Sequence, residues 1–423
     1  MSDTAIKSVR GRRVWDSRGR PTVEAEVTLA DGSVGRGMAP AGASRGSREA
    51  VDLRDANKKL GGFDVAAAVA NVNGEIAATL AGVDAGDQAE VDTLLIELDG
   101  TPTKSRLGGN ATIAASLAVL HAAAASSGQP LWKYVARGAA VTLPLPEIQI
   151  FGGGAHAGRR VDIQDFMVMA LGAKTFDQAL EMTAEVYLAA GGLMKAAGKQ
   201  AGVADEGGYW PLFAANEEAL ETLTRAIESA GFKHDEVAIS LDIAASEFGS
   251  GCGYKLGLEN REFDTAGMID MLGKWIAAYP IVSVEDPLAE DDEAGLIEFT
   301  RRFSKKVQII GDDYLVTNAL RITHAAAIGA CNCALIKLNQ AGTVTETKAA
   351  LDAAKSAGWN TIVSARSGET EDVTITHLAV GWNAGQLKVG SFSRSERMAK
   401  WNEGLRIEEA TGAPFAGRKA LFP

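Results

Sequence analysis

The sequence predicts an α/β protein made of an N-terminal α+β domain and a C-terminal β/α barrel. Three observations carry this prediction. The chain has 423 residues, which is more than one ordinary hydrophobic core holds. Its first part alternates polar and apolar residues, as an antiparallel sheet does, and its second part places short β-rich runs between helix-length segments. We therefore expect two domains, at residues 1–140 and 141–423.

The N-terminal domain begins with a predicted hairpin. Residues 7–36 alternate polar and apolar positions around Asp31-Gly32, a dipeptide typical of tight hairpin turns. A loop rich in small residues, 39–49, comes next, and helical patterns then extend to about residue 137. The proline-spaced segment VTLPLPE is expected to be extended and marks the boundary between the domains.

The second domain contains short β-rich runs that each end on a charged residue. The intervals between these ends are long enough for one helix and one strand. Parallel strands joined by such crossovers close into a β/α barrel, whose functional groups collect where the strands end. The residues expected at this mouth are Asp242, Glu285, Asp312, Lys337, Arg366 and Lys388.

The composition argues against several classes of partner. A formal net charge of -12 gives no positive footprint for nucleic acid or an anionic membrane, so an anionic small substrate needs locally placed cations or a metal. The three cysteines form neither a disulfide framework nor a zinc pattern, which suits a reducing cytoplasm. We find no signal segment and no apolar run of about 18 residues, and therefore expect a cytoplasmic protein with no membrane partner.

Three carboxylates at separate strand ends are candidate metal ligands. Asp242, Glu285 and Asp312 can converge on a hard divalent cation, because Mg²⁺ prefers oxygen ligands and keeps positions open for substrate oxygens. One acid at a strand end is more often a helix cap or a solvated rim residue. Three such acids followed by two lysines favour a Mg²⁺ site.

Two lysines at strand ends are candidates for proton removal and anion binding. Lys337 ends an apolar run, where partial burial and nearby cations are expected to lower its pKa and provide a neutral amine base. The alternative is a lysine whose stem packs on apolar surface while its head pairs with acids. Lys388 is expected to hold an anionic substrate, although from sequence the two lysines can exchange roles.

Two glycine-rich stretches carry further candidates. In GVADEGGYW, Glu206 precedes paired glycines and is a candidate acid for assisting a leaving group, with a plain acidic turn as the alternative. In GGGAHAGRRVDIQDF, His156 and Asp165 flank a loop followed by a strand-like run.

These residues stand within motifs that resemble the enolase family of Mg²⁺-dependent phosphopyruvate hydratases. The resemblance covers nearly the whole chain and implies an N-terminal α+β domain that caps an enolase-type β/α barrel beginning with two strands and two helices, usually in a homodimer. The motifs appear in the family's order, as DSRGRPTVEAEV, GASRG, KSRLGGNA, GGGAHAG, DIQDFM, DEGG, SLDIAASEF, YPIVSVEDPLAEDD, GDDYLVTN, IKLNQAGT, SARSGETED, GQLKVGSFSRSER and NEGLRIEE.

The resemblance also implies roles for individual residues. It makes Asp242, Glu285 and Asp312 the metal ligands, Lys337 the general base and Glu206 the acid that assists loss of hydroxide. It makes loop 39–49 mobile. Ser44 on this loop is then the serine that joins a second Mg²⁺ on closure. The positions implied to contact substrate are His156, Gln164, Arg366, Ser367 and Lys388.

The departures from the family pattern lie in the same pocket. Ala365 stands where the family has histidine, and Asp165, a candidate catalytic residue, stands where it has glutamate. Both changes enlarge the leaving-group side, because an imidazole is absent and a carboxylate is withdrawn by roughly 1.5 Å. Arg45 and Arg48 add positive charge to loop 39–49, where we expect them to bind substrate.

The sequence therefore favours an enzyme that uses lysine to remove a proton from a phosphoglycerate-like acid and forms an enolpyruvate product. Its specific form would be a carboxyphosphonoenolpyruvate synthase of phosphonate biosynthesis, with a nucleotide-activated phosphonoformate as candidate partner. One alternative is an ordinary phosphopyruvate hydratase that converts 2-phosphoglycerate to phosphoenolpyruvate. The other is a non-catalytic scaffold, against which the retained buried charges argue.

Overall fold

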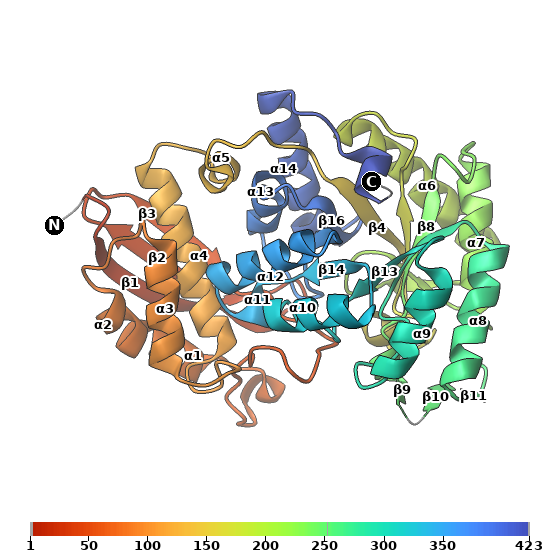
Figure 1. Ribbon diagram of the computed structural model, residues 1–423, viewed down its shortest axis with the longest axis horizontal. Helices are drawn as coiled ribbons and strands as arrows, with labels where there is room; N and C mark the ends of the chain where they lie inside the picture. The colour runs from red at the N-terminus through yellow and green to blue at the C-terminus, as the bar shows by residue number, and fades with distance from the viewer. Residues whose placement is uncertain (1–2, 252, 422–423) are drawn as a thin grey trace.

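The structure is a computed structural model of the chain and describes residues 3–251 and 253–421 (Figure 1). An N-terminal α+β domain lies at one end of the molecule and a closed barrel at the other. The predicted fold class is therefore confirmed.

Three antiparallel strands form the N-terminal sheet, in the order β1-β2-β3. Their bounds are β1 (Ile6–Trp15), β2 (Pro21–Leu29) and β3 (Val34–Met38). A tight turn joins β2 to β3, and there Gly32 has a φ of 90°, a conformation that glycine adopts without strain. The antiparallel sheet expected from residues 7–36 is present.

Helices follow the sheet and pack on it. Their bounds are η1 (Lys59–Gly62), α1 (Ala66–Asn71), η2 (Val72–Ile76), α2 (Ala77–Leu80), α3 (Gln88–Asp99), α4 (Gly109–Ser126) and α5 (Leu131–Ala136). Helix α4 lies so close to β3 that a Cβ on Gly35 would meet the Ala118 carbonyl oxygen at 2.2 Å. Only glycine permits this approach. The other side of α4 packs against helices of the barrel domain, so nearly all of its residues are buried.

The barrel strands close through a pairing of the last strand with the first, and β5 alone runs antiparallel to its neighbours in this closed ring of described strands. In order around the barrel they are β4 (Leu145–Gly152), β5 (Asp165–Met169), β8 (Ala238–Asp242), β12 (Ile281–Glu285), β13 (Gln308–Gly311), β14 (Cys333–Ile336), β15 (Asn360–Ser364) and β16 (Gly385–Ser391). The segment VTLPLPE, expected to be a boundary, contains the start of β4 at Leu145.

The remaining helices surround the barrel or connect its strands. Those between β4 and β12 are η3 (Gly154–Ala157), α6 (Phe176–Ala197), α7 (Asn216–Ser229), η4 (Ala245–Glu247) and α8 (Thr265–Ala278). Those after β12 are α9 (Glu293–Phe303), α10 (Ala319–Ile328), α11 (Leu338–Ala341), α12 (Val344–Ser356), α13 (Thr374–Gly381), α14 (Ser395–Thr411) and η5 (Gly417–Ala420). The short strands outside the barrel are β6 (Gln200–Val203), β7 (Tyr209–Pro211), β9 (Gly249–Ser250), β10 (Gly253–Leu256) and β11 (Arg261–Phe263). The barrel therefore begins with two strands and two helices, β4-β5-α6-α7, as the resemblance implies.

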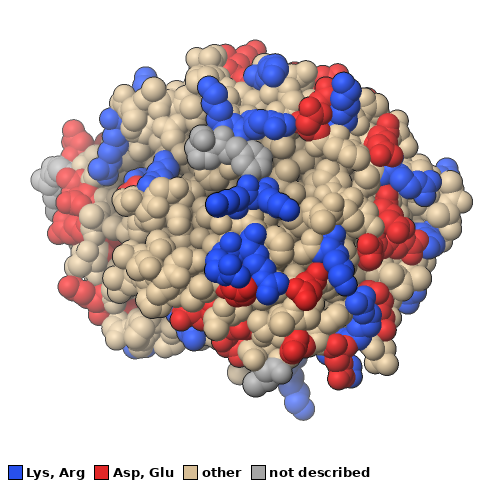
Figure 2. Space-filling view, turned by 45° about the vertical axis from the view of Figure 1, so that its right-hand side comes forward, with Lys and Arg blue, Asp and Glu red and all other residues tan. Residues whose placement is uncertain are grey.

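Charged side chains mostly face solvent. On the face drawn in Figure 2, lysines and arginines are interspersed with aspartates and glutamates. Cys331 and Cys333 are free and buried, whereas Cys252 lies outside the described residues. Among the described residues, no helix combines the length and apolar character needed to cross a membrane. The charged groups buried at the barrel mouth are exceptions to this pattern, and they mark a candidate site.

Candidate active site

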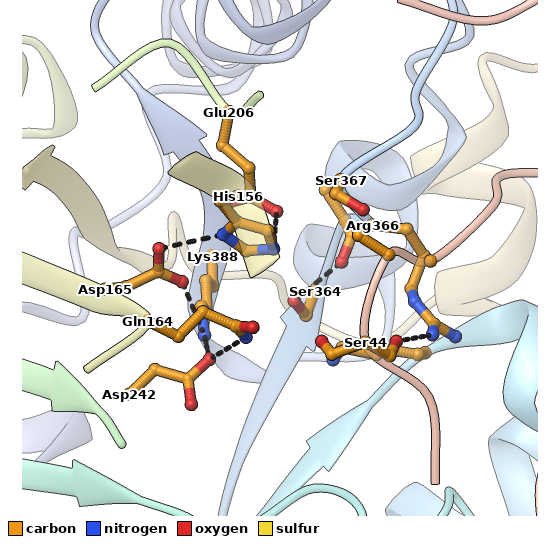
Figure 3. Close-up of a pocket in the computed structure, with 14 residues that line it drawn as sticks. Ser44, His156, Gln164, Asp165, Glu206, Asp242, Ser364, Arg366, Ser367 and Lys388 are labelled. Carbon is orange, nitrogen blue, oxygen red and sulfur yellow. Dashed lines mark hydrogen bonds and ion pairs between the residues drawn. The ribbon is translucent and has the colours of Figure 1, made fainter. Parts of the chain in front are cut away.

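The residues predicted at the strand ends meet in one pocket at the carboxyl ends of the barrel strands, beneath loop 39–49 (Figure 3). The predicted residues that line it are Ser44, His156, Gln164, Asp165, Glu206, Asp242, Lys337, Arg366, Ser367 and Lys388. Glu285 and Asp312 lie beside it, and each is ion-paired with a lining lysine. Ala365 also lines the pocket.

Lys388 is paired with two candidate metal ligands. Its Nζ lies 3.0 Å from Asp242 Oδ2 and 2.7 Å from Glu285 Oε2, and all three side chains are buried. The neighbouring Gln164 donates from Nε2 to the same Asp242 oxygen at 3.0 Å. Burial and the charge of Asp242 raise the pKa of Glu285, whereas Lys388 opposes that rise. Burial lowers the pKa of Lys388, but the charges of Asp242 and Glu285 outweigh it, so this pKa is raised.

The candidate base Lys337 is paired with the third candidate ligand. Its Nζ lies 2.5 Å from Asp312 Oδ2. Burial lowers the pKa of Lys337, but the Asp312 carboxylate outweighs this effect and the net pKa is raised. The expectation of a lowered pKa is therefore wrong for the protein without metal, because an anion is closer to the amine than any cation. For Asp312, burial raises the pKa, and Lys337 with Arg366 reverses the shift and lowers it.

The candidate ligands offer what a divalent cation needs. Asp242 and Glu285 end β8 and β12, and Asp312 follows β13, which are neighbouring strands of the barrel. Glu285 Oε1 is buried and has no hydrogen-bond partner, so it is free to bind a cation. Oxygen donors are the ligands that Mg²⁺ prefers. These residues therefore fit Mg²⁺.

A second cluster of acids beside Asp312 has a structural explanation. Asp286, Asp312 and Asp313 lie close enough together to hold a metal. However, the Asp286 carboxylate already accepts the backbone N–H groups of Asp312 and Asp313, at 2.8 and 2.9 Å. This contact fixes the turn after β13 and thereby the direction of Asp312.

His156 links two acids in the pocket. Its Nδ1 lies 3.1 Å from Asp165 Oδ1 and its Nε2 lies 3.7 Å from Glu206 Oε1, with all three residues buried (Figure 3). Burial lowers the pKa of His156, but Asp165 and Glu206 together raise it to about 9. Burial raises the pKa of Asp165, but His156 and Lys388 lower it to about 2. Asp165 thus belongs to a charged network with both His156 and Lys388.

The turn that carries Glu206 depends on glycine. Gly207 has a φ of 96°, and a Cβ at this position would meet the Ser393 carbonyl oxygen at 2.5 Å. Neither condition suits another residue. The sequence GVADEGGYW therefore makes a constrained turn that directs Glu206 into the pocket, and the plain-turn alternative does not describe it.

Loop 39–49 is held over the pocket by Arg366. The guanidinium donates from Nη1 to Glu49 Oε2 at 2.8 Å and from Nη2 to the Ser44 carbonyl oxygen at 3.0 Å. Ala41 and Gly368 exchange both of their backbone hydrogen bonds, at 2.9 and 2.8 Å. Ser44 is thereby brought to the pocket wall.

The structure does not place the loop arginines where substrate binding was expected. Arg45 and Arg48 are exposed and do not line the pocket. Arg45 Nη1 lies 4.0 Å from Asp52 Oδ2, outside the site. The small residues Gly42 and Ala43 line the pocket instead, and the two arginines of this loop turn to solvent.

The turn after β13 is strained and supports the site. Val316 and Thr317 have φ values of 44° and 50°, which β-branched residues rarely adopt and which cost roughly 1–3 kcal/mol each. The Thr317 hydroxyl accepts the Lys337 N–H at 2.9 Å and donates to Gln340 Oε1 at 2.6 Å. The strained turn thus positions the residues around the candidate base.

Sequence reasoning missed several supporting residues. Glu49 pairs with Arg366, and Arg18 donates to Ser367 Oγ at 3.1 Å. Gln149 hydrogen-bonds to the Asp165 carboxylate, and its Oε1 accepts the Gly208 N–H at 2.8 Å. Gln149 could have been found from the alternation of a strand, because it shares a face of β4 with Glu147. Glu49 could not have been found this way. A buried arginine such as Arg366 requires an acidic partner, but the sequence offers many acids that could fill that place.

Known proteins resemble the chain along nearly its whole length. Residues 6–135 match a family model described as the enolase N-terminal domain, and residues 140–422 match one described as the enolase C-terminal TIM barrel domain. Enolase 1 of Desulfitobacterium hafniense (strain Y51) is 49% identical over 420 residues, which cover 98% of this chain and 95% of that relative.

Proposed function

The chain belongs to the enolase family, and from that premise we propose that it is a phosphopyruvate hydratase, which dehydrates 2-phosphoglycerate to phosphoenolpyruvate. The observation that carries the proposal is that one pocket holds two sets of charged groups. Lys337 and Lys388 are ion-paired with the acids at the strand ends, and the His156–Glu206 pair lines the same pocket. Such a site can remove a proton and assist a leaving group within one cavity.

The two lysines and the strand-end acids suit proton removal next to a carboxylate. Lys337 would accept the proton once it gives up its own, which it holds against Asp312 in this structure. Asp242, Glu285 and Asp312 would hold Mg²⁺, the metal that enolases use. When bound, Mg²⁺ supplies positive charge that stabilises an enediolate.

The His156–Glu206 pair suits loss of hydroxide. Glu206 would pass a proton to the leaving oxygen, and the imidazolium of His156, whose Nε2 lies 3.7 Å from Glu206 Oε1, would supply that proton and become neutral. Lys388, Arg366, Gln164 and Ser367 would hold the anionic substrate, because their donor groups line the pocket. Ser44, on the loop above them, would complete the site as a ligand of a second Mg²⁺.

A direct assay tests this proposal. Purified protein is mixed with 2-phosphoglycerate and Mg²⁺, and the enol product is followed by its ultraviolet absorbance. We expect turnover that a chelator abolishes and that Lys337→Ala removes while Mg²⁺ binding persists. No turnover by a wild-type protein with bound Mg²⁺ would contradict the proposal.

A second candidate is a changed substrate within the same chemistry. It is favoured by Ala365, which lines the pocket where the family motif has histidine, and by Asp165, which engages both His156 and Lys388. Carboxyphosphonoenolpyruvate synthase is the specific form of this reading. The 49% identity to a relative named Enolase 1 favours the ordinary reaction instead. Parallel assays with 2-phosphoglycerate alone and with a nucleotide-activated phosphonoformate separate the two.

We also propose that the protein is a homo-oligomer, with a dimer as the simplest form. The family supports this proposal, because the resemblance to enolases implies a homodimer. A cytoplasmic location suits the free, buried thiols of Cys331 and Cys333. Light scattering of the purified protein tests the assembly.

A further inference from the structure

Helix α11, which begins directly after Lys337, contacts both ends of loop 39–49. Asn339 Nδ2 donates to the Pro40 carbonyl oxygen at 3.1 Å, near the start of the loop. The backbone carbonyl of Gln340 accepts the N–H of Ala50, the residue that follows the loop, at 2.8 Å. The segment that carries the candidate base therefore also holds the loop.

The side chain of Gln340 bridges the loop and a candidate metal ligand. Its Nε2 donates to Asp312 Oδ1 at 2.7 Å and to Glu49 Oε1 at 3.3 Å. These residues are buried, so few water molecules can replace the contacts. One neutral amide thus lies between two carboxylates, one from the loop and one from the barrel.

The orientation of this amide is fixed by Thr317. The Thr317 hydroxyl accepts the N–H of Lys337, so its own proton is free to be donated to Gln340 Oε1 at 2.6 Å. The amide oxygen is therefore held on the Thr317 side, and the NH₂ group must face Asp312 and Glu49. Gln340 cannot flip without losing these hydrogen bonds.

Glu49 continues the connection to substrate-binding positions. Its carboxylate accepts both Arg366 Nη1 at 2.8 Å and Arg366 Nη2 at 3.2 Å, and its Oε1 accepts the Gly46 N–H at 3.0 Å. A run of buried hydrogen bonds therefore extends from Asp312 through Gln340 and Glu49 to Arg366. If the loop opened, Glu49 would leave and Gln340 would lose one of its two anionic partners.

We propose that Gln340 is a positioning residue that couples closure of loop 39–49 to the carboxylate of Asp312. With the loop closed, Gln340 holds Asp312 in the direction a cation requires, and by reciprocity a cation on Asp312 favours the closed loop. The inference rests on the proposed function, because that function makes Asp312 a Mg²⁺ ligand.

The test uses two readouts on the full-length protein, Mg²⁺ affinity by calorimetry and hydrogen exchange of the loop amides. Gln340→Met keeps the length of the side chain and removes its hydrogen bonds. We expect Mg²⁺ to bind about 10- to 100-fold more weakly and the loop amides to exchange faster by a similar factor, because hydrogen bonds to charged groups are lost. Thr317→Val removes the hydroxyl that orients the Gln340 amide. It should also weaken Mg²⁺ binding and speed exchange of the loop amides, and it replaces Gln340→Met as the test if that variant does not fold.

Asn339→Leu is the matched control. Asn339 donates to Pro40 and accepts from Arg366 but has no hydrogen bond to Asp312. This variant should speed exchange of the loop amides while the loop stays mostly closed, so Mg²⁺ affinity should stay within about twofold of wild type. The coupling would be overturned if Gln340→Met kept either the Mg²⁺ affinity or the loop exchange of the wild type. If Gln340→Met does not fold, the same result in Thr317→Val would overturn it. Neither readout requires turnover. A wild-type protein that shows the coupling but does not act on 2-phosphoglycerate would therefore refute the proposed function alone.

Discussion

Replacement of Asp165 with asparagine tests the charge pairing between Asp165 and His156 in the pocket. Asp165 Oδ1 lies 3.1 Å from His156 Nδ1, and both side chains are buried. Burial lowers the pKa of His156, whereas Asp165 and Glu206 raise it from 6.5 to about 9. That difference corresponds to roughly 3 kcal/mol in favour of the imidazolium. Asp165→Asn removes the larger of the two acidic contributions, so the pKa of His156 should fall towards or below 6.5.

The sign of the effect on stability follows from these pKa shifts. A raised folded-state pKa of His156 stabilises the fold fully below about pH 6.5, and this contribution is lost as the pH rises through about 9. The lowered folded-state pKa of Asp165 stabilises the fold fully above about pH 3.8, and this stabilisation is lost as the pH falls through about 2. The shared contribution is therefore complete between about pH 4 and pH 6.5. Asp165→Asn should reduce the free energy of unfolding by up to about 3 kcal/mol more at pH 6 than at pH 9.5.

Two measurements on the metal-free protein check this prediction. Histidine-selective NMR gives the pKa of His156, and urea unfolding at the two pH values gives the free energies. Asp165→Glu keeps the charge and is the control, and its His156 pKa should stay well above 6.5. The reasoning is refuted if Asp165→Asn leaves the His156 pKa near 9, or if its loss of stability is the same at both pH values.

Three further substitutions test other parts of the site. Lys337→Ala should lower kcat for 2-phosphoglycerate by about 10²–10⁴-fold through loss of the general base, and a kcat within tenfold of wild type would remove Lys337 from that role. Gly46→Ala places a Cβ 2.8 Å from Val316 Cγ1, so loop 39–49 should pack less closely on the barrel and KM should rise. Limited proteolysis of the loop is the check, and an unchanged KM with an unchanged cleavage rate would contradict this prediction. Ala365→His combined with Asp165→Glu should change hydratase activity less than about tenfold if the ordinary reaction is native, whereas a larger gain would favour the changed substrate.

Much of the fold and of the pocket lining could be predicted from residue pattern. The strand-end acids and lysines were recognisable because each follows an apolar β-rich run, and strand ends of a barrel share one mouth. The first two barrel strands are recognisable only in part. The start of β4 falls within the proline-spaced segment expected to be an extended boundary, and β5 falls in the strand-like run after the glycine-rich loop. Neither fits the spacing of a regular β/α repeat, because β5 runs antiparallel to both of its neighbours.

The missed features of the site depend on distances between segments remote in sequence. The pKa of Lys337 is raised because Asp312 lies 2.5 Å away, a separation that no local pattern encodes. Arg45 was expected in the pocket because its loop covers substrate, but loop 39–49 turns small residues inward and arginines outward. The pairing of Glu49 with Arg366 joins the two domains and depends on how they pack.

The rate of phosphoenolpyruvate formation from 2-phosphoglycerate by the wild-type protein tests the central claim most directly. The account predicts Mg²⁺-dependent turnover at an ordinary enzyme rate, on the order of 1–10³ s⁻¹, that stops on chelation and is lost in Lys337→Ala. A wild-type protein that binds Mg²⁺ and folds normally, yet forms no phosphoenolpyruvate, would contradict it.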